Sequence, residues 1–185
     1  MCSKTISTLK NKIYKIENSS NCNNSCLESK SNNKERIKKE VHQCLQKIIL
    51  LSNYKERCTE ETYNRLVMEG KFNIDIINEA IDKAVEYKII DNNRYAQFYL
   101  LSKFNNHYGI NGILKHLDKM KINYLDNKQF YILLNDCKEK EYDLAINFIK
   151  RHPSKAKNKY RSIFNKLYRR GYSLDITKKI AHKYC

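Results

Sequence analysis

Chain-breaking residues are scarce in this sequence: four glycines and one proline occur among 185 residues. Sandwiches, barrels and Gly-rich phosphate-binding loops need many tight turns, and Gly and Pro are the strongest turn formers. Their scarcity favours helices joined by short connections. At this length a chain can bury about 68–70% of its unfolded surface, so a core can form without a metal ion or a disulfide. The sequence therefore predicts an all-α globular chain.

Apolar residues from about residue 36 onward recur with the spacing of helices. Ile37, Val41, Leu45 and Ile48 fall on one face of a helix. Asp91 is a helix-capping residue type that precedes another such pattern. The same interpretation gives nine helices, which begin near residues 36, 59, 73, 92, 111, 126 and 139, followed by one that ends at Arg170 and one that Ser173 caps.

A repeat of about 50 residues runs through the helical part. Leu66, Leu117 and Leu167 are spaced 51 and 50 residues apart, and each precedes a large apolar residue that opens the next helix. Helical repeats stack into elongated, curved arrays, because one repeat cannot bury its apolar face alone. We expect a disordered polar and basic tail followed by three tandem three-helix repeats, at residues 1–34, 35–90, 91–138 and 139–185 respectively.

Positive charge is concentrated at the C-terminal end. The formal net charge is +16, and residues 150–185 alone contribute +11. Residues 41–88 contribute −1, residues 89–122 contribute +3 and residues 123–149 contribute −2. A coding bias toward Lys would raise the charge everywhere, so this one-sided placement indicates a function. An excess of positive charge attracts polyanions such as nucleic acid, an anionic membrane or an acidic protein surface.

The C-terminal segment carries most of the candidate binding residues. Its cations are expected to contact phosphates, with strongly salt-dependent affinity and no sequence readout; a solvated face is the alternative. Interleaved tyrosines could stack on bases, or they could belong to the core, which is the favoured interpretation for Tyr160. The candidate cations are Lys150, Arg151, Lys155, Lys157, Lys159, Arg161, Lys166, Arg169 and Arg170, and the candidate rings are Tyr168 and Tyr172.

Signals for catalysis, metals and membranes are missing from the sequence. The five histidines fall in different predicted helices or turns, outside any GxSxG, HExxH or Walker motif. Seven cysteines are scattered without a CxxC pair, which favours reduced thiols over zinc ligands. Neither a signal peptide nor an apolar run of membrane-spanning length is recognisable. We expect a cytoplasmic protein that is not an enzyme and uses no cofactor or metal.

Two motifs resemble those of a known family. Residues 90–96, IDNNRYA, resemble the LDDxRYA signature that opens the second repeat of RecX, the regulatory protein of the RecA recombinase. Residues 167–173, LYRRGYS, resemble the C-terminal L.RRGFS element of that family. The resemblance covers about residues 40–185. Departures such as Cys58 at a usual Ser and Thr62 at a usual Leu make the first repeat the most divergent.

The resemblance implies three three-helix repeats and a modulator of RecA, not an enzyme. RecX proteins are thought to lie along the groove of the RecA–single-stranded-DNA filament and to reduce ATP hydrolysis and strand exchange. The implied partners are the RecA filament and single-stranded or double-stranded DNA, with no membrane and no small-molecule substrate. The implied processes are recombination, DNA repair and the SOS response. The matching positions add Arg94 and Tyr95 to the candidate binding residues.

Other interpretations stay open at this point. A non-specific DNA-binding helical-repeat protein that acts independently of RecA would carry the same charge pattern. A peripheral membrane or scaffold protein is a third class, although the basic helices lack a Trp/Phe/Leu-rich insertion face. Arg94 could pair with a neighbouring acid and Tyr95 could be a core residue. Arg169 and Arg170 could serve the C-terminal helix dipole, which is worth about 0.3–1 kcal/mol.

Overall fold

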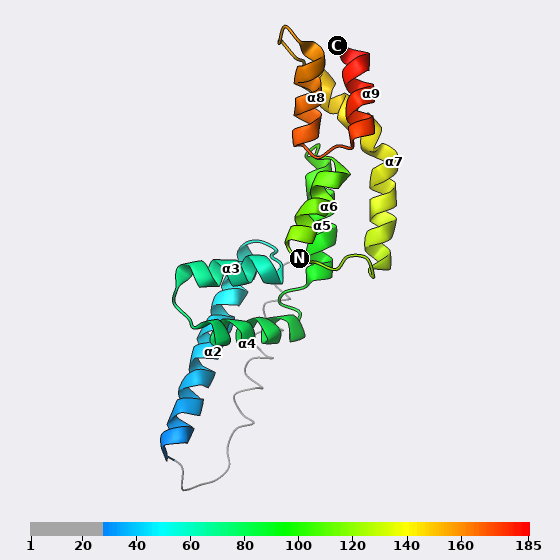
Figure 1. The fold of residues 1–185 in the computed structure, drawn as a ribbon. Helices are drawn as coiled ribbons and strands as arrows, with labels where there is room; N and C mark the ends of the chain where they lie inside the picture. Colours follow the sequence, from blue (N-terminus) through cyan, green and yellow to red (C-terminus); the bar gives the residue numbers. More distant parts are fainter. Residues whose placement is uncertain (1–27) are drawn as a thin grey trace. The chain divides into compact units, whose positions relative to one another are not determined.

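A computed structural model describes residues 28–185, and all regular structure in this range is α-helical. The predicted all-α class is confirmed. Of the predicted tail, residues 1–27 lie outside the described residues, and residues 28–34 belong to the first described helix. Figure 1 labels the helices α2 (Glu28–Tyr54), α3 (Thr59–Glu69), α4 (Ile74–Glu86), α5 (Asn92–Asn105), α6 (Ile110–Lys119), α7 (Lys128–Arg151), α8 (Lys159–Arg169) and α9 (Leu174–Tyr184).

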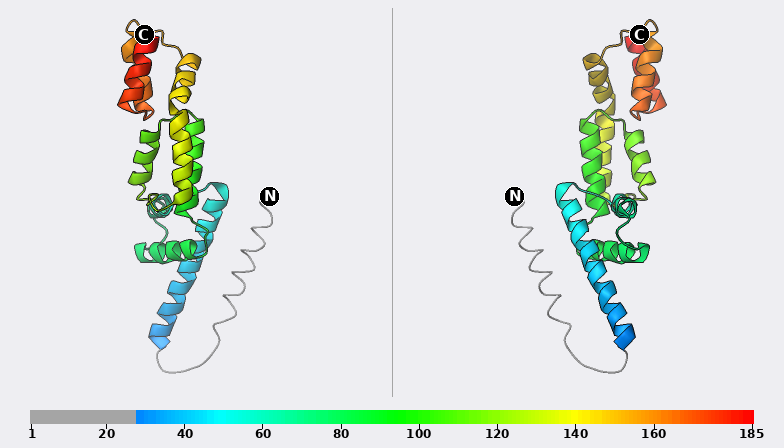
Figure 2. Two further views of the ribbon diagram at one scale, coloured as in Figure 1. Left: turned by 90° about the vertical axis from the view of Figure 1, so that its right-hand side faces the viewer. Right: turned by 90° about the vertical axis from the view of Figure 1, so that its left-hand side faces the viewer.

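Three hydrophobic cores follow one another within residues 39–185, which form one compact region. The first helical unit is the part of α2 from Lys39 onward with α3 and α4, the second is α5, α6 and the first half of α7, and the third is the rest of α7 with α8 and α9. Figures 1 and 2 show α8 and α9 side by side in every view. Leu66, Leu117 and Leu167 are fully buried, one in each core. The expected repeat limits and the elongated arrangement stay predictions.

The predicted number of helices is wrong at one place. The sixth and seventh predicted helices are a single helix, α7, so residues 28–185 form eight helices. Cys137 is the one apolar residue among residues 135–140. The buried stripe nevertheless continues through Cys137 and Glu141, and no Gly or Pro between residues 128 and 151 stops the helix. The expected repeat limit at residue 138 therefore falls inside α7.

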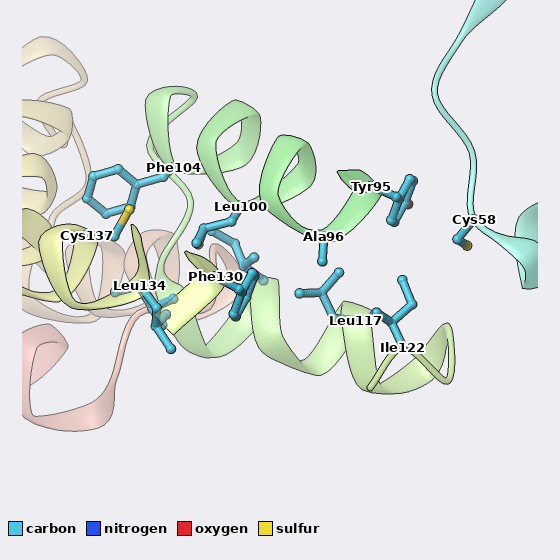
Figure 3. Close-up of a cluster of buried hydrophobic side chains, with 12 residues drawn as sticks. Cys58, Tyr95, Ala96, Leu100, Phe104, Leu117, Ile122, Phe130, Leu134 and Cys137 are labelled. Carbon is cyan, nitrogen blue, oxygen red and sulfur yellow. The ribbon is translucent and has the colours of Figure 1, made fainter. Parts of the chain in front are cut away.

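The second core takes side chains from three helices of its own unit and from the chain that precedes it (Figure 3). Leu100 and Phe104 on α5 pack with Leu117 on α6 and Phe130 on α7. Fully burying a side chain of this size contributes about 1.5–3 kcal/mol. Cys58, the N-cap residue of α3, belongs to the same core. The first and second helical units therefore share buried contacts.

Side-chain caps fix where several helices begin. The Asp91 carboxylate accepts hydrogen bonds from two backbone N–H groups of α5, at 2.9 and 3.1 Å. The Ser173 hydroxyl accepts one from α9 at 3.2 Å. Both residues were predicted as caps, and both predictions are confirmed. Asn73 occupies the N-cap position of α4 without such a side-chain bond.

Candidate nucleic-acid interface

The basic segment at residues 150–185 comprises the end of α7, a loop, α8 and α9. Lys166 is half-buried, and its Nζ donates to the carbonyl oxygen of His152 at 3.0 Å. This bond ties the loop to α8. Seven other predicted cations are exposed: Lys150, Arg151, Lys155, Lys157, Lys159, Arg161 and Arg169.

Carboxylates do not neutralise this segment. Its one acidic residue is Asp175, in the first turn of α9. In the part of the chain that the structure describes, no cation of residues 150–185 forms an ion pair with a carboxylate, whereas Lys47, Arg94 and Lys121, for example, do form such pairs. The positive charge of residues 150–185 is therefore available to an external anion.

A hollow of about 510 Å³ lies between α5, α6 and the turn that joins α8 to α9. Its lining is rich in cations and aromatic rings and includes no Asp or Glu. We call it the basic hollow. The side chains that define it are Lys103, Lys115, Arg169, Arg170, Tyr99, Tyr108, Tyr168 and His116.

Direct contact between two backbones holds the walls of the basic hollow together. The Gly109 N–H donates to the carbonyl oxygen of Arg170 at 2.9 Å, and the Gly112 N–H donates to that of Gly171 at 3.0 Å. A Cβ on Gly171 would overlap the backbone of Gly112, and Gly171 also has a φ of 82°. Only glycine combines this φ with so close an approach. This glycine joint uses three of the four glycines in the chain.

Arg170, a predicted binding residue, is held by the protein itself. Its guanidinium donates to the carbonyl oxygens of Asn106 and His107, at 2.9 and 3.3 Å. The same group lies 4.1 Å from the ring centroid of Phe148 and 5.0 Å from that of Tyr108. Such cation–π contacts hold the side chain in place, and the guanidinium remains positively charged. Arg170 is therefore a structural clamp between the second and third helical units and one wall of the basic hollow.

Two of the predicted aromatic contacts are core residues. Tyr95 and Tyr172 each expose 2% of their surface, and burial raises the pKa of both phenols. The Tyr95 hydroxyl donates to Glu61 at 2.9 Å, and the Tyr172 hydroxyl donates to the carbonyl oxygen of His107 at 3.2 Å. Neither ring can stack on an external base. Tyr168 is 56% exposed and is the predicted ring that reaches the surface.

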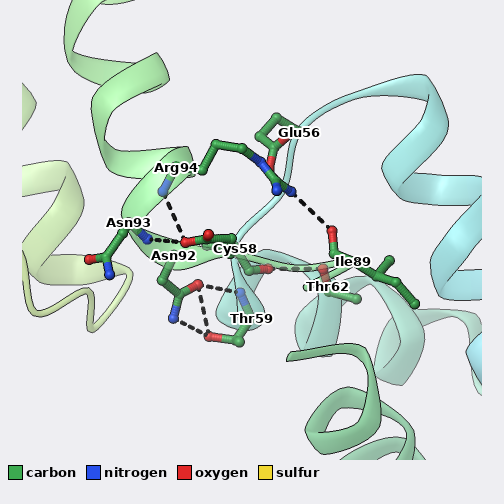
Figure 4. A network of polar contacts seen from close by, with 9 residues as sticks. Glu56, Cys58, Thr59, Thr62, Ile89, Asn92, Asn93 and Arg94 are labelled. Carbon is green, nitrogen blue, oxygen red and sulfur yellow. Dashed lines mark hydrogen bonds and ion pairs between the residues drawn. The ribbon is translucent and has the colours of Figure 1, made fainter. Parts of the chain in front are cut away.

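Arg94 lies at the contact between the first and second helical units, outside the basic hollow (Figure 4). Its Nε donates to Glu56 at 2.8 Å, and a terminal nitrogen donates to the carbonyl oxygen of Ile89 at 3.2 Å. Beside it, the Asn92 side-chain oxygen accepts a hydrogen bond from the Thr59 N–H at 3.0 Å. Pairing with a neighbouring acid, the alternative for Arg94, is the arrangement in the structure.

Sequence reasoning missed the α5–α6 wall of the basic hollow. Lys103 Nζ lies over the rings of Tyr99 and Tyr108, 5.5 and 5.1 Å from their centroids. Tyr99 stacks on His116 with centroids 4.2 Å apart, and burial lowers the pKa of His116. The net charge of +3 in residues 89–122 was the one available signal. Periodicity cannot tell which helices meet the α8–α9 turn.

Metal and membrane signals are also absent from the part of the chain that the structure describes. No cluster of His, Cys, Asp or Glu there could hold a metal ion. Cys22 and Cys26 lie outside that part, and the exposed Cys185 donates its S–H to the carbonyl oxygen of His182 at 3.3 Å. None of the helices between residues 28 and 185 is long and apolar enough to cross a membrane.

Comparison with known proteins identifies the fold. No protein-family profile and no curated protein matches the sequence. A crystal structure of the regulatory protein RecX matches with a TM-score of 0.65 and 16% identity, over 88% of this chain and 81% of that one. RecX from Lactobacillus salivarius matches with a TM-score of 0.56 and 23% identity, over 79% of this chain and 97% of that one. The chain therefore has the RecX fold, as its two sequence motifs predicted.

Proposed function

We propose that this chain regulates the RecA recombinase by binding along the groove of the RecA–single-stranded-DNA filament and inhibiting ATP hydrolysis and strand exchange. The observation that carries the proposal is the RecX fold, because one matching structure is that of a regulatory protein. The motifs at residues 90–96 and 167–173 support the same assignment. The setting would be recombination and DNA repair in the cytoplasm.

A regulator of this kind acts by binding and needs no catalytic group, so we propose a protein that is not an enzyme. The cations of residues 150–185 have no carboxylate partner in the described structure, and such charge suits both the DNA backbone and an acidic protein surface. A bound protein shifts an equilibrium only by its difference in affinity for the two states. Inhibition therefore requires tighter binding to a filament state that hydrolyses ATP slowly.

The test is single-stranded-DNA-dependent ATP hydrolysis by RecA, titrated with the full-length protein at moderate salt. We expect inhibition at amounts well below one per RecA protomer, unchanged by excess DNA. A variant with Lys157→Glu and Arg161→Glu should inhibit less, since both cations are exposed in the basic segment. The matched control, Lys128→Glu with Lys140→Glu, makes the same charge change at exposed positions of α7.

The alternative is a DNA-binding helical-repeat protein that acts independently of RecA. The absence of carboxylate partners for the cations of residues 150–185 in the described structure favours it as the second candidate. In that case the ATPase would fall only as the protein removes DNA from RecA, and excess DNA would restore it. Equal inhibition by both charge-reversal variants would also contradict a contact through the basic segment.

A further inference from the structure

The basic hollow combines three features of a site for an unpaired nucleotide: positive charge, an exposed aromatic ring and a lining free of acidic residues. Nucleic-acid backbones are recognised by Lys and Arg, and unpaired bases stack on aromatic side chains. A solvated surface patch of ordinary composition would mix both signs of charge. The ligand chemistry that matches the lining is a phosphate joined to a flat aromatic base.

We propose that the basic hollow binds a single unpaired nucleotide, with its phosphate at Lys115 and Arg169 and its base against the ring of Tyr168. This inference deepens the function proposed above and rests on it for the identity of the strand, that of the RecA-bound DNA. It also assigns the DNA contact to the boundary between the second and third helical units.

The walls of the hollow are built before any ligand arrives. The glycine joint fixes α6 against the α8–α9 turn. Lys103 and Arg170 are held over aromatic rings, so their charges are positioned without further loss of side-chain entropy. Lys115 and Arg169 are exposed residues of the lining, so a backbone phosphate can reach them.

Tyr168 is the one tyrosine of the hollow that can serve as a stacking platform. Its ring is stacked on Phe164, with centroids 6.0 Å apart and an interplanar angle of 16°, and 56% of the residue is exposed. Tyr99 is already packed on His116, and Tyr108 carries Lys103 and Arg170. A base within a duplex is stacked on its neighbours, so this geometry selects single strands.

The experiment measures binding of the full-length protein to fluorescein-labelled oligothymidylate of about 12 nucleotides by fluorescence anisotropy, without RecA. A second probe of equal length carries abasic sites and so offers phosphates alone. Tyr168→Leu should weaken binding of the thymidine probe about tenfold and that of the abasic probe by no more than about twofold. The control Tyr131→Leu removes an exposed tyrosine of α7 outside the hollow and should leave both unchanged.

The phosphate contacts are tested with Lys115→Gln plus Arg169→Gln, against Lys119→Gln plus Lys128→Gln as an exposed control pair. The first pair should weaken both probes and lower the slope of log affinity against log salt by about 1.4, since each contact on a single strand adds about 0.7. Unlabelled ATP identifies the source of the nucleotide. If ATP displaces the probe as well as oligothymidylate does, the site takes a free nucleotide and the assignment to a DNA strand is wrong; if it does not, the strand assignment is supported.

Several results would overturn this inference. Duplex DNA or polyglutamate that binds as tightly as the thymidine probe would mean a non-selective anion surface. If Tyr168→Leu and Tyr131→Leu weaken binding of the thymidine probe equally, the base does not stack on Tyr168. If Lys115→Gln plus Arg169→Gln leaves the salt slope unchanged, these two residues do not contact phosphates. If the protein binds the oligonucleotide as expected but does not inhibit the RecA ATPase, the proposed function is wrong and the nucleotide site is still supported.

Discussion

Arg169 and Arg170 are neighbours in the sequence and differ in what their side chains contact. Arg169 is exposed on α8 and lines the basic hollow, whereas Arg170 is bound to two carbonyl oxygens that follow α5. The sequence places both in one motif and cannot separate them, because the acceptors are more than 60 residues away in the chain. A basic residue in a binding motif can therefore be a structural residue.

The two arginines should therefore differ in how much they contribute to stability. Arg170→Gln should lower the free energy of unfolding by about 1–3 kcal/mol, because it removes two charge-assisted hydrogen bonds. Arg169→Gln should change it by less than about 0.5 kcal/mol, as expected for an exposed position. Urea denaturation followed by circular dichroism measures both. Similar losses for the two variants would show that Arg170 does not clamp the helical units.

At the scale of helices, α6 and α7 depend on one buried carboxylate. The N-cap of α6 is Gly109, which has no side chain to cap it. Glu141 of α7 caps the helix instead, because its Oε1 accepts a hydrogen bond from the Ile110 N–H at 2.8 Å. Burial raises the pKa of Glu141 above its usual 4.5, because the carboxylate is taken out of water. The carboxyl group therefore binds protons more readily in the folded chain than in the unfolded one.

The sign of the resulting pH dependence follows from that direction. A carboxyl group whose pKa is raised on folding stabilises the fold below pH 4.5. This contribution is lost as the pH rises through the pKa of the folded state. Glu141→Gln keeps an acceptor without a charge, so its stability relative to the unchanged protein should increase from about pH 4 to about pH 7. Glu141→Ala orphans the Ile110 N–H and should cost about 1–3 kcal/mol. Urea denaturation measures the free energy of unfolding of Glu141→Gln and of the unchanged protein. A difference between them that does not vary with pH would contradict the raised pKa of Glu141.

The glycine joint provides a second prediction for helix contacts. Gly70 and Gly171 both have positive φ, 62° and 82°, but a Cβ on Gly70 would meet nothing within 4 Å. Gly70→Ala should therefore cost only the strain of the left-handed backbone, about 1–2 kcal/mol. Gly171→Ala adds overlap with Gly112 and should cost about 1–3 kcal/mol more. Thermal unfolding of both variants measures the difference, and equal losses would mean that the backbones can separate freely.

The fold was more predictable from the sequence than the candidate site. Leu66, Leu117 and Leu167 were recognisable because a buried leucine at a fixed spacing follows from helix packing alone. Helix ends were recognisable where a local residue forms the cap. The continuity of α7 was not, since Glu141 is a polar residue in a core position, satisfied by a partner 31 residues away. The basic hollow depends entirely on which helices meet, and local patterns do not contain that information.

Across residues 39–185, charge and packing follow different rules. Net charge could be located from the sequence because it needs no contacts: residues 150–185 hold +11 in any fold. Stability instead depends on contacts between neighbouring helical units. Cys58 of the first unit packs in the second core, and the glycine joint links the second unit to the third. In a linear array of units, each unit is stabilised mainly by those next to it.

The second helical unit should therefore be the last to open. Opening it breaks contacts with two neighbours, whereas opening the first or third breaks contacts with one. Amide hydrogens of α5 and α6 should exchange on the order of tenfold more slowly than those of α4 or α9, as measured by hydrogen-exchange mass spectrometry. Gly171→Ala should speed exchange in α8 and α9 while α3 and α4 keep their rates, because the substitution loosens the joint to the third unit alone. Uniform acceleration along residues 39–185 would mean that the three cores unfold as one, and the linear array would be the wrong description of this chain's stability.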